Sequence, residues 1–197
     1  MTRVTATYEE PRRPSNPILA GYHQEYDAIA ADVQSLAAGL TGAQFNWRTQ
    51  PGTWSIAECL GHLTVFGATC LEPLDRQIAE VKSRGLRADG PFYETWLGNW
   101  FIGVVEPPYR LRAKTFRNLI PPPEQQLADA LPAFLHLQEQ VQERVLAADG
   151  FDVGAVTARI PSKLSLTLGQ WYRFIAAHER RHLWQAWNVR NHPAFPR

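Results

Sequence analysis

Three histidines are the residues of this chain best suited to chemistry. His178 and His182 stand four residues apart in a stretch with the pattern of a helix, and His62 lies in a second helical stretch far upstream. Residues four apart on a helix differ by about 40° in direction and about 6 Å along the axis, so their rings can converge. Three imidazoles from two helices form a set that holds a divalent metal ion and leaves positions for water or substrate. From the residues alone, two interpretations stay open: three metal ligands, or three ordinary hydrogen-bonded core histidines.

The helical positions of these residues favour the metal interpretation. On an ideal helix, His62 points about 130° away from the apolar stripe of its helix, on a side shared with Glu58 and Phe66. A histidine that only filled the core would lie in the stripe. His178 and His182 belong to an inward, aromatic face, whose other members are Trp171, Phe174, Ile175, Gln185 and Val189.

The segment from His178 to His182 also fits the H-E-x-x-H motif of zinc proteases, in which the glutamate is the general base. The rest of that pattern is missing, because positions 185 and 188 are Gln and Asn and no Asp or Glu follows residue 179. A protease is therefore disfavoured. Glu179 lies about 100° from His178 on the helix, and we expect it to be solvated, together with Arg180 and Arg181.

Four long stretches carry apolar residues at three- and four-residue steps, which is the pattern of amphipathic helices. The second and fourth begin with capping boxes, Ser55 with Glu58 and Thr167 with Gln170. The four amphipathic stretches predict an all-α protein, a four-helix bundle with a long connection between its second and third helices. We assign a flexible arm to residues 1–16 and one domain to 17–197. The four helices cover about residues 17–39, 55–85, 123–148 and 167–190.

The remaining segments predict smaller features. Residues 41–54 are rich in turn formers and predict a loop, residues 92–101 predict a short aromatic helix, and residues 156–160 predict a short extended piece. Pro73 and Pro132 lie inside the second and third long helices, where a proline removes a backbone donor. We expect a kink or a break at the first and a bend at the second.

Cysteine content and charge set the cellular expectations. Cys59 and Cys70 are the only cysteines, and on one helix they would lie about 16 Å apart, beyond disulfide reach. We expect reduced thiols and a cytoplasmic protein. Cys59, near His62, could be a soft ligand or a reactive thiol, although such a cysteine is more often a small core residue. A net charge of +1 and the lack of long apolar runs predict binding to neither nucleic acid nor membranes.

Two segments resemble the signature segments of the DinB/YfiT-like superfamily. The resemblance covers about residues 17–190, and a segment from Lys114 to Pro121 is similar to the Pro-terminated linker of that family. The signature segments are Trp54-Ser-Ile-Ala-Glu58-Cys-Leu-Gly-His62-Leu and His178-Glu-Arg-Arg-His182-Leu-Trp-Gln185.

The resemblance implies a four-helix bundle in which His62, His178 and His182 bind a divalent ion, with zinc, nickel, iron and manganese all plausible for the family. Glu58 and Gln185 are candidates for side chains that support these ligands, although capping already accounts for Glu58. Dimers are common among related bundles, so a homodimer is also an expectation.

Characterised members of the family suggest what such a site does. They include thiol-dependent S-transferases that use bacillithiol or mycothiol, a thiol-dependent maleylpyruvate isomerase, and proteins described as metal-dependent hydrolases. The first hypothesis is therefore a metal-dependent transferase that joins a low-molecular-weight thiol to a small-molecule substrate. The second is a hydrolase in which Glu179 or Glu58 handles the proton. The third is a metal-stabilised bundle without enzymatic activity.

The first hypothesis also assigns roles to neighbouring side chains. An aromatic neighbourhood would hold an apolar electrophile. A basic edge, Arg110, Arg112 or Lys114, would meet carboxylates of the thiol, although solvated cations are the commoner case. The aromatic residues are Trp54, Trp96, Trp100, Trp171 and Phe174.

Overall fold

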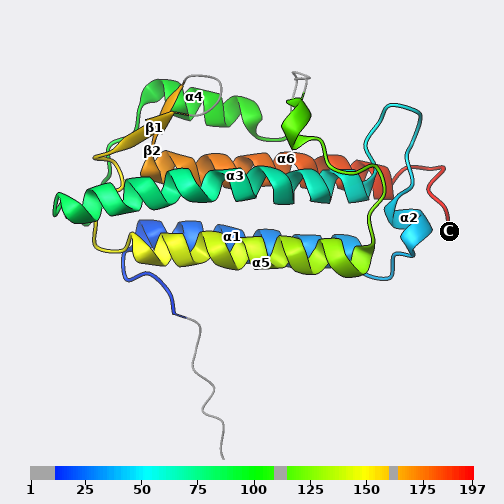
Figure 1. The fold of residues 1–197 in the computed structure, drawn as a ribbon, viewed down its shortest axis with the longest axis horizontal. Helices are drawn as coiled ribbons and strands as arrows, with labels where there is room; N and C mark the ends of the chain where they lie inside the picture. Colours follow the sequence, from blue (N-terminus) through cyan, green and yellow to red (C-terminus); the bar gives the residue numbers. More distant parts are fainter. Residues whose placement is uncertain (1–11, 109–114, 160–163) are drawn as a thin grey trace, which may run out of the picture.

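Four long helices run side by side along the length of the protein (Figure 1). The structure is a computed structural model that describes residues 12–108, 115–159 and 164–197. The protein is an all-α bundle, as the sequence predicts. Its long helices are α1 (Pro17–Ala37), α3 (Ile56–Ser83), α5 (Leu127–Ala147) and α6 (Leu168–Arg190).

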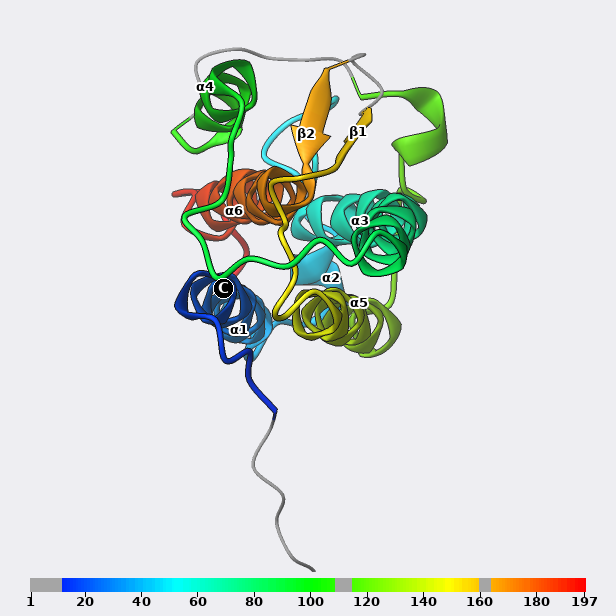
Figure 2. The same cartoon turned by 90° about the vertical axis from the view of Figure 1, so that its left-hand side faces the viewer.

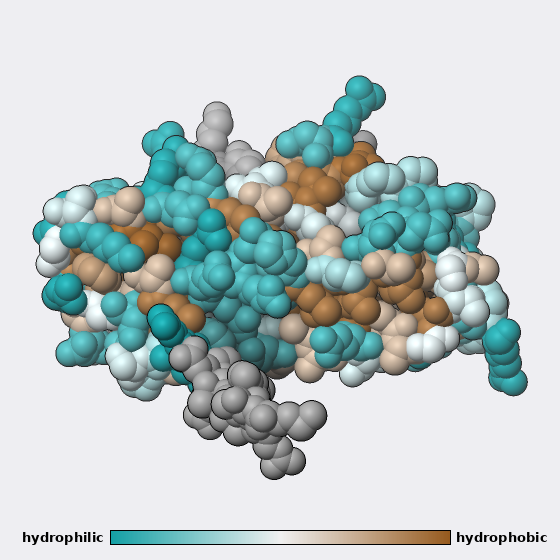
Figure 3. Space-filling view, turned by 60° about the horizontal axis from the view of Figure 1, so that its bottom comes forward, coloured by the Kyte–Doolittle hydropathy of each residue, from teal (hydrophilic) through white to brown (hydrophobic). Residues whose placement is uncertain are grey.

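The long helices form two layers, which Figure 2 shows end-on. Helix α3 packs on α5 and α6, and α1 packs on the same two helices, so the core lies between the α3–α6 layer and the α1–α5 layer. Figure 3 shows the α1–α5 side of the molecule, where polar side chains alternate with apolar ones. The largest fully buried side chains include Tyr26, Phe45, Leu63, Phe134 and Tyr172.

A third layer covers the outer side of α3 and α6. It contains α4 (Trp96–Val105), which packs on α6, and the short 3₁₀ helix η1 (Arg117–Leu119), which contacts α3. Two short strands, β1 (Thr157–Arg159) and β2 (Ser165–Thr167), form an antiparallel hairpin in the same layer. The extended piece predicted at residues 156–160 corresponds to β1. The described parts of the connection between α3 and α5, together with the hairpin that precedes α6, therefore cover one side of the bundle.

The two helices that carry the histidines begin with the predicted capping boxes. The Ser55 hydroxyl accepts a hydrogen bond from the Glu58 backbone N–H (3.1 Å), and the Glu58 carboxylate accepts one from Ser55 N–H (2.9 Å). Thr167 and Gln170 form the same reciprocal pair at the start of α6. These bonds satisfy backbone donors that a helix start leaves open.

Some local predictions need correction. The loop predicted at 41–54 contains a one-turn helix, α2 (Gly42–Phe45), because Thr41 and Gln44 form a third capping box. Helix α3 is one helix across Pro73, so the break is excluded and the kink stays a prediction, since a proline removes only one helical donor. The third long helix starts at Leu127 rather than near residue 123.

Two further observations concern the N-terminal end of the bundle and the length of its helices. Ser15 and Asn16, at the end of the predicted arm, hydrogen-bond to the Asp149 carboxylate at 2.7–3.1 Å, whereas residues 1–11 lie outside the described part. None of the helices that the structure describes is long and apolar enough to cross a membrane.

Candidate metal centre

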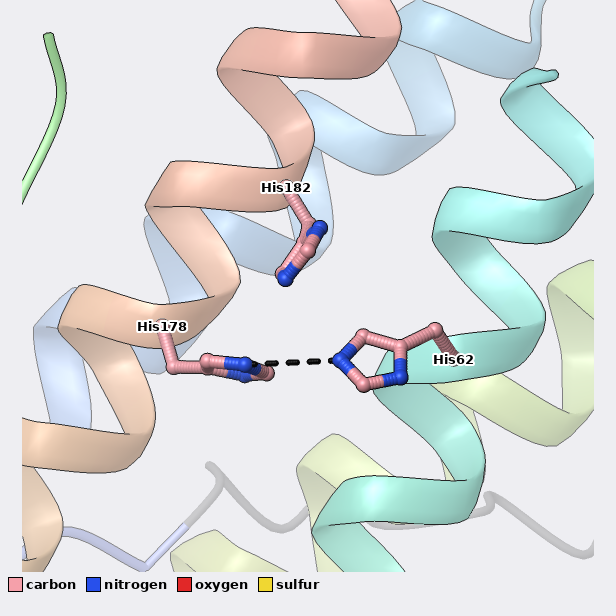
Figure 4. A group of neighbouring side chains, drawn as sticks. All are labelled: His62, His178 and His182. Carbon is pink, nitrogen blue, oxygen red and sulfur yellow. Dashed lines mark hydrogen bonds between the residues drawn. The ribbon is translucent and has the colours of Figure 1, made fainter. Parts of the chain in front are cut away.

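His62 from α3 meets His178 and His182 from α6 (Figure 4). The centroids of the three rings lie 4.6–5.1 Å apart, and each ring offers a nitrogen within 4.8 Å of the others. The Nε2 atoms of His62 and His178 are 3.4 Å apart. Two nitrogens bound tetrahedrally to one ion at about 2.0–2.1 Å would be about 3.4 Å apart. The His62–His178 pair therefore already has the spacing of two ligands of one ion, and the group of three could hold a metal ion.

The group lies on the outer side of the α3–α6 layer, not in the core between the four long helices. His62 faces η1, because its Nδ1 is 2.8 Å from the carbonyl oxygen of Leu119. This location agrees with the predicted direction of His62, away from the apolar stripe of α3. The expectation of an inward face for His178 and His182 needs a qualification: this face of α6 turns toward the covering layer.

The hydrogen bond of His62 determines its tautomer. A carbonyl oxygen can only accept, so Nδ1 of His62 carries the proton and Nε2 keeps its lone pair. The Nδ1 atoms of His178 and His182 are buried and have no hydrogen-bond partner among the described residues. The lone pair of His62 Nε2 faces His178, where a shared ion would bind.

All three imidazoles are neutral at neutral pH. Burial lowers the pKa of His62, and the Leu119 carbonyl offsets part of that effect. Burial, together with the neighbouring His62 and Arg181, lowers the pKa of His182 to about 3, and a hydrogen bond with Gln185 partly opposes the shift. The pKa of His178 is also well below its ordinary value, first because of burial. Neutral imidazole is the form that binds a metal.

Aromatic rings surround the histidines. Phe66 lies 4.0 Å from His178, measured between ring centroids, and Trp54 stacks on His182 at 5.5 Å and lies 5.0 Å from His62. Phe174 contacts Phe66 at 5.8 Å. Apolar walls of this kind strengthen electrostatic interactions within a site.

The other predicted aromatic residues lie further away. Trp171 is buried and reaches the site through Phe174, at 6.1 Å between ring centroids. Trp96 and Trp100 lie on α4 and are 79% and 61% exposed. The basic residues Arg110, Arg112 and Lys114 lie outside the described residues.

Glu58 and Cys59 have roles that do not involve the histidines. Glu58 caps α3 and accepts a hydrogen bond from Arg48 Nε at 2.8 Å. Burial would raise the pKa of Glu58, but its bonds with Arg48 and Ser55 outweigh burial and lower it. Cys59 is a buried core residue whose thiol pKa is raised by burial, and both cysteines are free thiols.

The structure contradicts the prediction that Glu179 is solvated. Its side chain is 1% exposed and accepts a hydrogen bond from Gln138 Nε2 at 2.8 Å. Helix α6 is covered on two sides, by the other long helices and by the third layer, so a residue 100° from His178 turns into the core. Glu179 therefore cannot act as the base of a protease at the histidines.

Arg180 also differs from the prediction. Its guanidinium is partly buried and forms ion pairs with Glu106, at the end of α4, and with Glu25 on α1. Arg173 binds Glu94 and Asn99 in the same region. These contacts attach the covering layer to α6.

Sequence reasoning did not identify the contribution of Leu119 to the site. The sequence marks the segment from Lys114 to Pro121 as similar to the linker of the family, but a backbone carbonyl carries no signature in the side-chain pattern, so its bond to His62 could not be predicted. Phe66 did have a signal, because it shares the side of α3 on which His62 lies.

Comparison with known protein families gives a match that spans the site. A family model described as the DinB superfamily matches residues 25–186, an interval that contains all three histidines. Searches of curated proteins and of solved structures gave no match.

Proposed function

The chain belongs to the DinB superfamily, and from that premise we propose that it binds one divalent metal ion through His62, His178 and His182 and uses it in catalysis. The observation that carries the proposal is the convergence of three neutral imidazoles from two helices, with the tautomer of His62 already set by a carbonyl. Imidazole ligands suit zinc, nickel and iron, whereas manganese favours oxygen ligands, so a site of three histidines ranks manganese below the other three.

Bound there, a divalent ion supplies a Lewis acid that lowers the pKa of a coordinating thiol or water. The chain's own residues provide the rest. His62, His178 and His182 orient their nitrogens from two rigid helices, and Trp54 and Phe66 limit access of water from the aromatic side.

We favour thiol transfer over hydrolysis. Glu58 and Glu179, the two carboxylates considered for moving a proton from water, are held by Arg48 and by Gln138. A thiol is the more acidic nucleophile and needs less help from a general base than water does. The aromatic wall of Trp54, Phe66 and Phe174 suits an apolar electrophile as the second substrate.

The cysteines and the charge of the chain bear on the cosubstrate, the compartment and the partners of this reaction. A low-molecular-weight thiol is the proposed cosubstrate, and free buried cysteines fit the reducing cytoplasm in which such thiols are kept. The near-neutral charge of the chain supports no role for nucleic acid. We also keep a homodimer as a proposal.

Metal content tests the site directly. Protein purified without an affinity tag and analysed for metals is expected to contain about one equivalent of a divalent ion, and His62→Ala is expected to lose it. His136→Ala is a matched control, because His136 is an exposed histidine that pairs only with Glu139 in the described structure. Equal metal content in the His62 variant and the control would contradict the proposed ligand set.

Turnover separates the three hypotheses. A chromogenic aryl halide is offered with a panel of low-molecular-weight thiols, using metal-free and reconstituted protein. Thiol- and metal-dependent turnover is expected. Hydrolysis of esters or amides without added thiol would favour the hydrolase instead. Metal binding without turnover of either class would favour a metal-stabilised bundle.

A further inference from the structure

The segment before α5 brings a backbone carbonyl to one of the three histidines. Residues 115–126 pass over the outer side of α3, and the Leu119 carbonyl oxygen accepts the Nδ1 proton of His62 at 2.8 Å. Leu119 itself is buried, with 8% of its surface exposed. The distance from this carbonyl to the ring depends on how firmly the segment is held against α3.

Gln125 anchors this segment to the first turns of α3. Its side-chain Nε2 donates to the carbonyl of Ala57 at 2.6 Å. Its backbone N–H donates to Asn46 Oδ1 at 3.0 Å, and its carbonyl accepts from Asn46 Nδ2 at 2.9 Å. Arg48, the partner of Glu58, also donates to the carbonyl of Pro123 at 3.2 Å. The anchor therefore reaches α3 at Ala57, five residues before His62.

Gly61 makes room for this anchor. Ala57 and Gly61 stand four residues apart and so share a face of α3. A Cβ atom at Gly61 would lie 2.3 Å from Gln125 Nε2 and 2.6 Å from Gln125 Oε1, closer than any real contact. The amide of Gln125 occupies the space that a side chain would take, directly beside His62.

We propose that Gly61 and Gln125 are positioning residues of the metal centre, Gly61 because it leaves room for the segment and Gln125 because its backbone bonds to Asn46 hold the segment in place. By seating the segment on α3, they place the Leu119 carbonyl so that His62 is held in the Nδ1–H tautomer with Nε2 open. The metal part of this inference rests on the proposed function; the tautomer part does not. Groups that orient a metal-binding histidine in this way typically change metal affinity about 10- to 100-fold when they are disturbed.

Four variants test the proposal, and one of them, Gln125→Ala alone, is the reference for the double variant. Gly61→Ala forces the Gln125 side chain out of its seat. Gly61→Ala combined with Gln125→Ala removes the crowding and keeps the backbone bonds to Asn46. Gly67→Ala is the matched control, because a Cβ there would lie 2.3 Å from Leu137 Cδ2 and disturbs the contact with α5 rather than the segment. It is expected to lower the melting temperature and to leave His62 unchanged.

The first readout is the tautomer of His62 in metal-free protein, from long-range ¹H–¹⁵N correlation spectra. Wild type, the control and the double variant are expected to show a protonated Nδ1, and Gly61→Ala a mixture of tautomers. The second readout is Co²⁺ affinity from visible absorption. Gly61→Ala is expected to raise the dissociation constant about tenfold, and the double variant to stay within about threefold of Gln125→Ala alone.

The results that would overturn the proposal are specific. They are a single Nδ1–H tautomer with wild-type Co²⁺ affinity in Gly61→Ala, no recovery in the double variant, or an equal loss in Gly67→Ala. If Gly61→Ala does not fold, the double variant decides. A double variant that folds with the wild-type tautomer supports the proposal, and one that does not contradicts it. Wild type that binds no Co²⁺ but keeps the tautomer would reject the proposed function and retain the positioning role.

Discussion

Helix α6 carries buried polar groups on two sides, and the two sets behave differently. On the outer side, His178 and His182 meet His62, a group that we call the histidine cluster. On the core side, Glu179 meets Gln138, which we call the carboxyl–amide pair. Burial neutralises both, since it lowers the pKa of each histidine and raises the pKa of Glu179 to about 8.

The difference lies in whether the group can complete its own hydrogen bonds. Glu179 Oε2 and Gln138 Oε1 are both buried and have no partner in the described part of the chain. A proton on Glu179 would let the carboxyl donate to Gln138 Oε1, beside the bond from Gln138 Nε2. The pair is then complete. In the histidine cluster, one proton cannot serve three converging lone pairs, whereas a cation can. In this protein, buried neutral polar groups therefore indicate a ligand site only in the histidine cluster, where several acceptor atoms point at one position.

The largest expected effect is stabilisation by a bound metal ion, which should depend on the histidine cluster and not on the carboxyl–amide pair. At a free Zn²⁺ concentration about 1,000 times the dissociation constant, binding should raise the free energy of unfolding by about 4 kcal/mol. His178→Ala should abolish that gain, and Glu179→Gln should keep it. Thermal or urea unfolding with and without Zn²⁺ measures both. A gain that survives in His178→Ala would place the ion elsewhere.

The second effect removes one half of the carboxyl–amide pair. Gln138→Ala leaves the Glu179 carboxyl buried without its partner and opens a cavity, so we expect a loss of about 3 kcal/mol of stability. The increase in stability with Zn²⁺ should remain, because the pair lies on the other side of α6. Urea unfolding of the metal-free and Zn²⁺-loaded variant measures the two quantities. A loss confined to the Zn²⁺-dependent part would mean that the two sides of α6 are coupled.

The smallest effect is expected from Glu179→Gln at pH 5, less than about 1 kcal/mol, because an amide reproduces both hydrogen bonds of the protonated carboxyl. Its pH dependence is more informative. The pKa of Glu179 is raised by burial from 4.5 to about 8, so the stability it contributes is full below pH 4.5 and is lost as the pH rises through 8. Wild type should therefore lose stability relative to Glu179→Gln between pH 5 and 8 in urea unfolding. Parallel curves would show that Glu179 is ionised throughout.

The helices and the pairing of the histidines could be predicted from sequence because they depend on local rules. Apolar spacing located the four long helices, and Ser55 and Thr167 located two of their starts within a residue. The spacing of His178 and His182, and the direction of His62 away from its stripe, follow from helical geometry alone.

The features that sequence reasoning missed depend on contacts between distant segments. Glu179 is polar and next to a predicted ligand, and the histidine face of α6 was expected to point into the core. Only the third layer, which covers the histidine face, shows that Glu179 is the residue that points into the core. The Leu119 carbonyl contributes through the backbone, which every residue shares. The seat for Gln125 exists because Gly61 has no side chain, and a glycine in a helix has no single meaning.

The cap of α3 also sets a limit on how this chain can change in length. Ser55 and Arg48 hold the first turn of the helix through Glu58, and His62 follows seven residues after Ser55. Inserting or deleting one residue in that interval would swing the imidazole by about 100° around the helix axis, toward the core. The chain can vary more freely in length at its surface loops, so natural length variation should spare the interval from residue 55 to 62.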